Sequence, residues 1–290
     1  MILLESHTAP VLEHPIRFQE YGVGIFKTIP TKSGIKKAIK KKLIFIDGIE
    51  ATTAKYISGR EKISLFTPKV SSRFKRLELA LEVLFEDDYF AVINKPPGVL
   101  VSGNKFMTIA NGLAQNLKKS TQSDAVRPQP VHRLDKPTSG VLLIGKTSAA
   151  IRALSALFLE KKIQKTYVAV AISVMDTKGD IQQTIEEKTA HTEFEVLQTI
   201  PSERFGYLNL VRLQPKTGRK HQLRKHLFGI GNPILGDQTY FNEGLVLKGK
   251  GLYLHAATLS FIHPFSKVAV RITKALPKKF KTIFRDALIH

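Results

Sequence analysis

The stretch from Gln129 to Thr147, QPVHRLDKPTSGVLLIGKT, constrains the fold more than any other part of the 290-residue chain. Pro130 and Pro137 fix the backbone φ angle on either side of a short polar segment, and the tripeptide TSG at 138–140 has typical turn composition. The apolar run Val141–Ile144 that follows is typical of a buried strand. The sequence therefore predicts a stiff loop that leads directly into the hydrophobic core.

This loop carries one carboxylate, Asp135, which is the only Asp or Glu over residues 125–159. Its near neighbours His132, Arg133 and Lys136 are all basic. Neighbouring positive charge favours the ionised form of a carboxylate, and an ionised carboxylate on a stiff loop is suited to act as a nucleophile. Spacing alone is equally compatible with an aspartate that only caps the turn after it.

The net charge points to a polyanionic partner. There are 45 Lys plus Arg against 24 Asp plus Glu, which gives a formal charge of +21. Such an excess attracts nucleic acid first and an anionic membrane surface second. No apolar run approaches the roughly 18 residues of a spanning helix, and residues 1–14 do not resemble a signal peptide. We expect a soluble, monomeric, cytoplasmic protein that does not bind membranes.

Composition also bears on cofactors. The chain has no cysteine, which excludes disulfides and Cys-based metal sites, and none of its nine histidines forms an HExxH pair. No GxGxxG motif opens a helix, which argues against a dinucleotide. We therefore expect neither a metal nor a small-molecule cofactor.

Residues 1–70 are predicted to form a separate small domain, because lysines accumulate over residues 21–46 without any acidic residue. A short helix is expected with Ser33 as its N-cap, followed by a strand that ends in an Asp47-Gly48 hairpin turn. This order of a basic helix before a β-hairpin resembles the S4-type RNA-binding domain.

The helix lysines are the expected RNA contacts of this domain. They are Lys32, Lys36, Lys37, Lys40 and Lys41. An ordinary helix with a solvated lysine face is the alternative, because runs of charge often do no more than face water.

Residues 71–76 are predicted to be a linker, because they are Ser-rich and basic without an apolar period. Over 77–290, strands of mixed length with few helices between them predict an α+β domain whose mixed, largely antiparallel sheet is flanked by helices. A helix is expected over 108–117 and another from a Ser148 cap. The segment 176–189 is expected to loop out, and the basic tail from Pro277 is expected to fray.

A second basic segment, TGRKHQLRKHL at 217–227, is predicted to be helical, because Leu223 and Leu227 form an apolar pair at four-residue spacing. Its N-terminal end would offer free backbone N–H groups to an anion, and Arg219 and Arg224 could add bidentate contacts. A surface helix with basic side chains is the alternative.

HRLDKPTSG at 132–140 resembles the catalytic motif of the RluA-type pseudouridine synthases, and five further segments follow that family's order. They are INKPPGVLV at 93–101, KTYVAV at 165–170, TGRKHQLRKHL at 217–227, NPILGDQTY at 232–240 and LHAATLSFIHP at 254–264. The resemblance covers about residues 77–276. It implies a central RNA-binding cleft, and an S4-like domain in front of the catalytic domain is a common arrangement in this family.

The implied reaction is the isomerisation of specific uridines to pseudouridine in ribosomal or transfer RNA. The N1–C1′ bond breaks, and the uracil turns and rejoins the ribose through C5. By resemblance, Asp135 is the nucleophile at either C1′ or C6, a choice that the sequence leaves open. Arg224 would pair with Asp135, and Tyr167 would stack on the uracil and assist removal of the C5 proton.

A stacked uridine must leave its helix before it can react. The resemblance assigns Arg133 to the space that the base vacates, where a guanidinium can stack. The remaining expected substrate contacts are His132, Arg219, Leu223 and Ile144.

Two other classes of protein are compatible with parts of the sequence. One is a non-catalytic RNA-binding or ribosome-assembly factor on the same fold. The other is a glycoside hydrolase, which needs a second acid about 5 to 10 Å from the first. The acid-free stretches around the motifs argue against the hydrolase.

Overall fold

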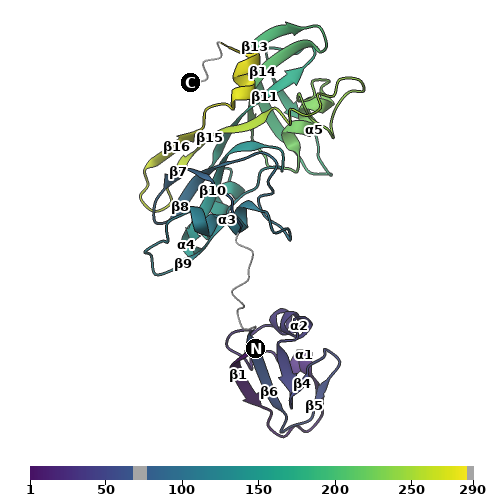
Figure 1. The fold of residues 1–290 in the computed structure, drawn as a ribbon, viewed down its shortest axis with the longest axis vertical. Coiled ribbons are helices and arrows are strands. Elements are labelled where there is room, and N and C mark those ends of the chain that lie inside the picture. Colours follow the sequence, from purple (N-terminus) through teal and green to yellow (C-terminus); the bar gives the residue numbers. More distant parts are fainter. Residues whose placement is uncertain (68–76, 286–290) are drawn as a thin grey trace. The chain divides into compact units, whose positions relative to one another are not determined.

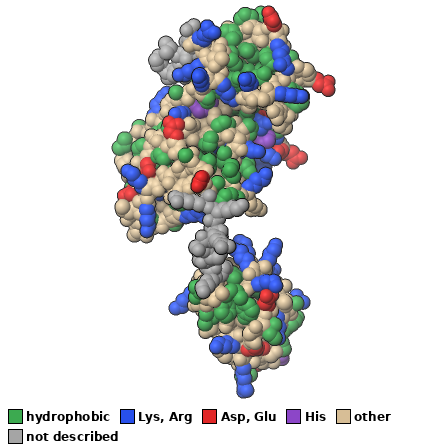
Figure 2. Space-filling model, viewed as in Figure 1, with side chains coloured by type: hydrophobic (Ala, Val, Ile, Leu, Met, Phe, Trp, Pro, Cys, Tyr) green, Lys and Arg blue, Asp and Glu red, His purple; other side chains and the backbone are tan. Residues whose placement is uncertain are grey.

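The computed structural model describes residues 1–67 and 77–285 (Figure 1). The chain forms two compact units, Met1–Arg76 and Leu77–His290. The linker predicted at 71–76 lies outside the described residues. Among the helices of the described part, none is both long and apolar enough to cross a membrane. Figure 2 shows Lys and Arg side chains spread over the displayed face with Asp and Glu side chains more sparse, in keeping with the net charge of +21.

The first unit contains a four-stranded antiparallel sheet in the order β1-β6-β3-β4, a two-stranded ribbon and two helices. The elements are β1 (Ile2–Thr8), β2 (Ile16–Arg17), α1 (Phe18–Tyr21), α2 (Lys32–Lys40), β3 (Ile44–Ile46), β4 (Ile49–Glu50), β5 (Tyr56–Ile57) and β6 (Lys62–Thr67). β3 and β4 form a hairpin through Asp47 and Gly48, both with positive φ. The predicted hairpin turn is confirmed.

Helix α2 packs Ile35 and Ala38 into the core of this unit and exposes its lysines. Its N-cap is Thr31, whose hydroxyl accepts a hydrogen bond from the backbone N–H of Gly34 at 3.1 Å. The prediction of Ser33 as the cap was wrong. Thr31 already has the extended backbone that a cap requires, which places Ser33 inside the first turn.

The second unit contains one large sheet in the order β12-β13-β14-β11-β15-β10-β8-β7, with β16 paired to β15 and β9 to β10. Its strands are β7 (Glu82–Glu86), β8 (Phe90–Lys95), β9 (Ala125–Pro130), β10 (Ser139–Thr147), β11 (Gln164–Ile172), β12 (Lys178–Gln182), β13 (His191–Ser202), β14 (Gly206–Pro215), β15 (Leu254–Ile262) and β16 (Ala269–Thr273). Its helices are α3 (Ile109–Asn116), α4 (Ser148–Leu159), α5 (Gln222–Gly229) and α6 (Lys278–Ile283). Within the described strands only β10 and β15 pair in parallel. The predicted α+β class with a mixed, largely antiparallel sheet is confirmed.

The parallel contact between β10 and β15 depends on a glycine. Gly140 has a φ of +115°, and a Cβ atom there would lie 2.1 Å from the carbonyl oxygen of Ala256. Only glycine allows the two backbones to approach so closely. Since Gly140 is the second residue of β10, just after the Asp135 loop, this contact fixes the loop against the sheet.

Two hydrophobic cores share the sheet. One includes Leu210 and Leu227 of the β14–α5 segment, and the other includes Leu142 of β10 and Leu154 of α4. Tyr167 of β11 packs against both cores. The junction between the two halves of the sheet therefore lies at this residue.

Three local predictions for the second unit were wrong. Helix α4 is capped by Thr147 instead of Ser148. The segment 176–189 contains β12, which forms because β13 offers it a partner edge, a contact that local polarity does not reveal. The tail forms α6 and buries Phe280 and Phe284, which are four residues apart. A frayed end was expected because the lysines in this segment made this apolar pair easy to overlook in the sequence.

Candidate active site

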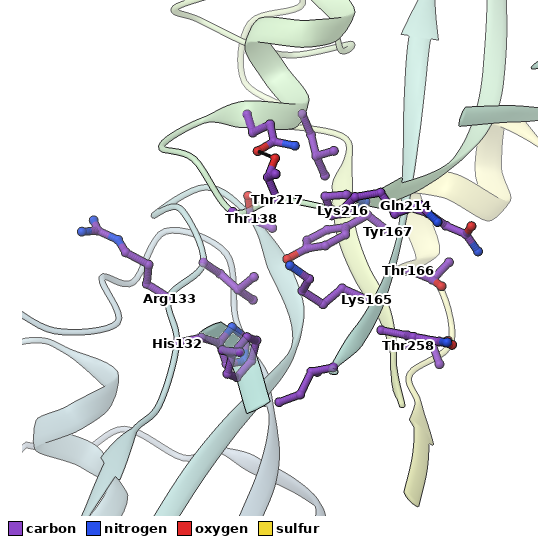
Figure 3. A pocket seen from close by; sticks show the side chains of 18 of the residues that line it. His132, Arg133, Thr138, Lys165, Thr166, Tyr167, Gln214, Lys216, Thr217 and Thr258 are labelled. Carbon is purple, nitrogen blue, oxygen red and sulfur yellow. Dashed lines mark hydrogen bonds between the residues drawn. The ribbon is translucent and has the colours of Figure 1, made fainter. Parts of the chain in front are cut away.

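A cavity of about 1180 Å³ opens in the second unit where the loop before β10, strand β11 and the β14–α5 loop converge (Figure 3). The segments HRLD, KTY and TGRKHQLR, which are far apart in the sequence, all line it. Asp135, Tyr167 and Arg224 are among its lining residues. We call this space the large cavity.

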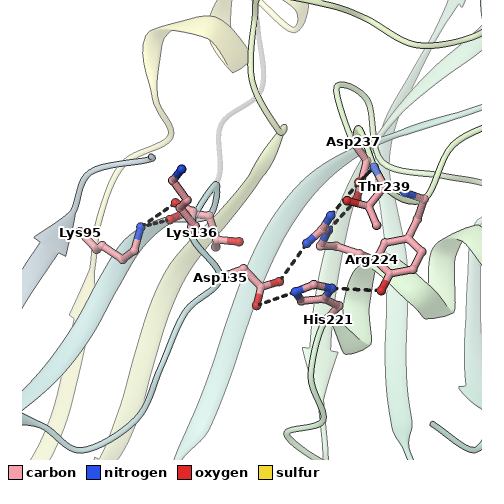
Figure 4. A network of polar contacts seen from close by, with 9 residues as sticks. Lys95, Asp135, Lys136, His221, Arg224, Asp237 and Thr239 are labelled. Carbon is pink, nitrogen blue, oxygen red and sulfur yellow. Dashed lines mark hydrogen bonds and ion pairs between the residues drawn. The ribbon is translucent and has the colours of Figure 1, made fainter. Parts of the chain in front are cut away.

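Asp135 and Arg224 face each other in the large cavity. The Arg224 Nη1 atom lies 3.5 Å from Oδ2 of Asp135, whose side chain is 19% exposed (Figure 4). On its other edge the guanidinium donates two hydrogen bonds to Asp237, from Nε at 2.6 Å and from Nη2 at 2.8 Å. The three side chains form a carboxylate–guanidinium–carboxylate chain that ends at the cavity.

Asp237 is itself held firmly. Its side chain is fully buried, and its Oδ1 atom accepts hydrogen bonds from the backbone N–H groups of Thr239 and Tyr240. The Arg224 guanidinium lies 5.0 Å from the centre of the Tyr240 ring. Burial acts to lower the pKa of Arg224, but pairing with Asp237 and Asp135 raises it on balance. Arg224 therefore stays cationic at a fixed position.

Asp135 does not cap the turn that follows it. The N–H of Thr138 donates to the backbone carbonyl of Asp135, and within the described residues the carboxylate contacts only Arg224 and His221. The turn is closed by the backbone carbonyl of Asp135 and not by its side chain, so the alternative of a simple turn cap is excluded. The carboxylate is instead directed into the large cavity.

Lys95 holds the Asp135 loop from the opposite side. Its fully buried Nζ donates to the carbonyl oxygens of Pro96, Lys136 and Thr138 at 2.8, 3.1 and 2.7 Å. Burial lowers the pKa of Lys95 to about 8, and the negative charge of Asp135 partly opposes this shift. Sequence analysis missed this role, although Lys95 lies within the INKPPGVLV block.

His221 was also missed. It caps α5 with a left-handed backbone, φ +55°, and its Nε2 atom lies 3.8 Å from Oδ1 of Asp135. Its Nδ1 atom lies 3.0 Å from the Tyr240 hydroxyl. Burial lowers the pKa of His221, against the opposing effect of Asp135. The basic residues around His221 gave no sequence signal that its side chain would lie near the carboxylate of Asp135.

Tyr167 extends from β11 into the large cavity (Figure 3). Burial raises the pKa of its phenol, and the negative charge of Asp135 raises it further. The hydroxyl is therefore protonated at neutral pH and lies in the electrostatic field of Asp135. Leu223, at the start of α5, supplies apolar lining to the same cavity.

Comparisons with known proteins show which family the chain belongs to. Residues 89–228 match the family model described as RNA pseudouridylate synthase. The chain is 35% identical over 232 residues to ribosomal large subunit pseudouridine synthase C of Salmonella typhi. The aligned region covers 70% of this chain and 69% of the relative. It is 32% identical over 282 residues to an uncharacterized RNA pseudouridine synthase of Aquifex aeolicus, and this alignment covers 88% of each chain. This chain belongs to the RluA-type pseudouridine synthases. It is an RNA-modifying isomerase, as predicted.

A solved structure supports the same conclusion for the fold. The human RNA pseudouridylate synthase domain containing 4 is 27% identical and superposes with a TM-score of 0.57, over 69% of this chain and 90% of that chain. Since this likeness covers most of that protein, the second unit has the fold of a pseudouridine synthase.

Two predicted arginines of this synthase line the large cavity in different ways. Arg133 is exposed, and it makes no hydrogen bond or ion pair with any described residue. In Figure 3 it points away from the other labelled side chains. Arg219 instead donates from Nε to the carbonyl oxygen of Thr189 at 3.1 Å. The guanidinium of Arg133 is thus available to bind a ligand, whereas that of Arg219 already donates one hydrogen bond to the protein backbone.

The side chains of His132 and Ile144 pack mainly against other residues of the protein. The His132 Nε2 atom accepts a hydrogen bond from the N–H of Leu143 at 3.0 Å, and its ring lies 4.7 Å from that of Phe158. His132 also contributes to the cavity wall. Ile144 is fully buried in β10 and does not line the large cavity. The expectation for Ile144 was wrong, because β10 is covered on both faces and its apolar residues belong to the core.

The environment of His132 predicts acid sensitivity. Burial lowers the pKa of His132 from 6.5 to about 3, with the positive charge of Lys165 acting in the same direction. Between these pH values the unfolded chain binds a proton that the folded protein does not. The stability from His132 is therefore complete above pH 6.5 and is lost as the pH falls toward 3.

We expect His132→Gln, whose amide oxygen can still accept from Leu143, to lose less stability than wild type between pH 6.5 and 4. Urea unfolding at a series of pH values measures this difference. The exposed His14→Gln serves as a control. Equal acid slopes in the two variants would contradict the assignment.

Proposed function

We propose that this synthase isomerises specific uridines of ribosomal or transfer RNA with Asp135 as its nucleophile. The observation that carries the proposal is the arrangement of Asp135 at the wall of the large cavity. Its carboxylate is directed into the cavity and faces the fixed cation Arg224. A ribosomal substrate is favoured, since the Salmonella typhi relative is named for the large ribosomal subunit. The reaction would take place in the cytoplasm.

The roles follow from the contacts. Asp135 attacks either C1′ of the ribose or C6 of the uracil, and the N1–C1′ bond breaks. The base turns, C5 bonds to C1′ and the bond to Asp135 breaks. The C5 proton leaves and N1 takes up a proton, so that substrate and product are isomers. Arg224 pairs with Asp135 and directs its carboxylate into the large cavity. Tyr167 stacks against the uracil and assists removal of the C5 proton, with Leu223 as an apolar wall.

Arg133 takes the place of the base that leaves the RNA stack. A planar guanidinium can stack on bases, and Arg133 is exposed at the large cavity without a protein partner in the described part of the chain. Extrusion of the uridine costs a few kcal/mol. The stacking of Arg133 would offset part of this cost.

We propose that the first unit is an S4-like RNA-binding domain and that the second is the catalytic domain. The support for the first is helix α2, whose exposed lysines lie on the side opposite the buried Ile35 and Ala38, followed by the β3–β4 hairpin. Lys32, Lys36, Lys37 and Lys40 surround one surface hollow, and Lys41 follows directly. One of these lysines, Lys32, also pairs with Glu20 at 2.5 Å.

Asp135→Asn tests the catalytic role while preserving shape. We expect it to slow tritium release from RNA labelled at uridine C5 by about 10³-fold or more, since the attacking group is removed. RNA affinity should stay within about threefold, because the contacts to the rest of the RNA remain. The exposed Asp176→Asn, with the same charge change, should behave as wild type. Unchanged tritium release from Asp135→Asn would refute the role of Asp135.

A second variant tests the first unit. The triple change of Lys36, Lys37 and Lys40 to Gln should weaken RNA binding and reduce the slope of log K against log salt by roughly 0.7 to 0.9 for each phosphate that the variant no longer neutralises. Lys27, Lys55 and Lys62, also exposed on this unit, provide a charge-matched triple control. Filter binding over a salt series measures both slopes. The same weakening in both triple variants would mean that only the total charge of the unit matters.

A further inference from the structure

Lys165 is a cation in the wall of the large cavity that the proposed roles leave unexplained. It lies two residues before Tyr167 on β11, so both side chains project from the same face of the strand. In Figure 3 the Lys165 amine lies at the hydroxyl end of Tyr167. Over residues 1–67 and 77–285, the side-chain ammonium of Lys165 forms no ion pair and no hydrogen bond with the protein.

The other buried or half-buried lysines of this unit have protein partners. Lys95 donates to three carbonyl oxygens, and Lys146 pairs with Glu86 at 2.7 Å and donates to the carbonyl of Asp87. Lys279 donates to the carbonyl of Leu252 at 2.7 Å. Lys165 differs from these three, because its ammonium is left for a ligand in the cavity.

Retaining such a charge costs stability. Burial lowers the pKa of Lys165, and no opposite charge among the described residues counteracts this shift. A partly buried cation without a partner is unfavourable for the folded state. A methionine of similar length could fill the same space without this cost. The fold therefore gives no reason for an ammonium at this position.

The chemistry of uridine isomerisation supplies a reason. If Asp135 adds to C6, the electron pair of the C5–C6 double bond moves through C5 and C4 to O4 and forms an enolate. If Asp135 instead displaces the base at C1′, the electron pair of the N1–C1′ bond stays on the uracil and is shared by N1, O2 and O4. In both routes negative charge reaches O4 before C5 bonds to C1′.

We propose that Lys165 is a further catalytic residue, which donates a hydrogen bond from its ammonium to O4 of the flipped uracil. This inference rests on the proposed function of Asp135. The ammonium keeps its proton throughout, and the hydrogen bond strengthens as charge builds on O4. A preorganised donor of this kind, in a cavity that excludes water, stabilises the transition state more than the ground state.

The first test is Lys165→Met, compared with Lys178→Met on β12, which is exposed and outside the large cavity. We expect Lys165→Met to lower the single-turnover rate at saturating RNA by about 10²-fold, which is the usual effect of removing one such donor. Its RNA affinity should stay close to that of Lys178→Met, and its melting temperature should equal or exceed that of wild type. Lys165→Arg keeps a cation and should recover part of the rate.

A substrate analogue tests the contact itself. RNA with 4-thiouridine at the target position replaces O4 by sulfur, a weaker hydrogen-bond acceptor. If Lys165 contacts O4, the effects of the thio substitution and of Lys165→Met on the rate will not be additive. Additive effects in this cycle would overturn the proposal.

Two other results would also overturn it. In one, Lys165→Met reacts at the wild-type rate while Asp135→Asn is inactive, which leaves the proposed function intact. In the other, Lys165→Met mainly weakens RNA binding and reduces its salt dependence, which would make Lys165 a phosphate ligand. An active Asp135→Asn would instead refute the proposed function, so the two failures are distinguishable.

Discussion

The buried pairing of Arg224 with Asp237 is the interaction on which the site depends. Two short hydrogen bonds fix the guanidinium in its own plane, and the remaining Nη1 is thereby directed toward Asp135. Breaking one partner of a buried pair typically costs about 3 to 5 kcal/mol, so Arg224 has little freedom to rotate away. Lys95 holds the backbone of the Asp135 loop from the other side through three carbonyl oxygens. The carboxylate is thus positioned by two buried cations, one through its side chain and one through its loop.

The sheet explains why these groups meet. The parallel contact of β10 with β15, which needs glycine at 140, brings the end of the Asp135 loop against the strand that follows the Asp237 segment. β11 pairs with the opposite edge of β15 and carries Tyr167 to the boundary between the two cores. The large cavity therefore lies where the two halves of the sheet join. A substrate in this cavity would contact side chains fixed by both cores.

The sequence predicted the fold class, the buried strand after the Asp135 loop and the segments that meet at the cavity, because apolar runs and the HRLDKPTSG motif are local signals. It did not predict the roles of Asp237, Lys95 or His221, since each depends on contacts between distant segments. Ile144 was placed in the cavity because a run of apolar residues does not show that both faces of the strand are covered. The helix caps were each misplaced by one or two residues, since several neighbouring Ser and Thr residues could serve. Lys165 lies in the KTYVAV segment, but the lack of a protein partner for its ammonium is apparent only in three dimensions.

The central claim is that Asp237 acts through Arg224 to position Asp135, and Asp237→Asn tests it most directly. The amide cannot neutralise the guanidinium, so the free energy of unfolding should fall by about 3 kcal/mol, against less than about 1 kcal/mol for Glu195→Gln at the exposed Arg212 pair. At a temperature where Asp237→Asn is folded, its single-turnover rate at saturating RNA should fall by about 10²-fold, as expected for a misplaced catalytic group. A folded Asp237→Asn protein that forms pseudouridine at the wild-type rate would contradict the account.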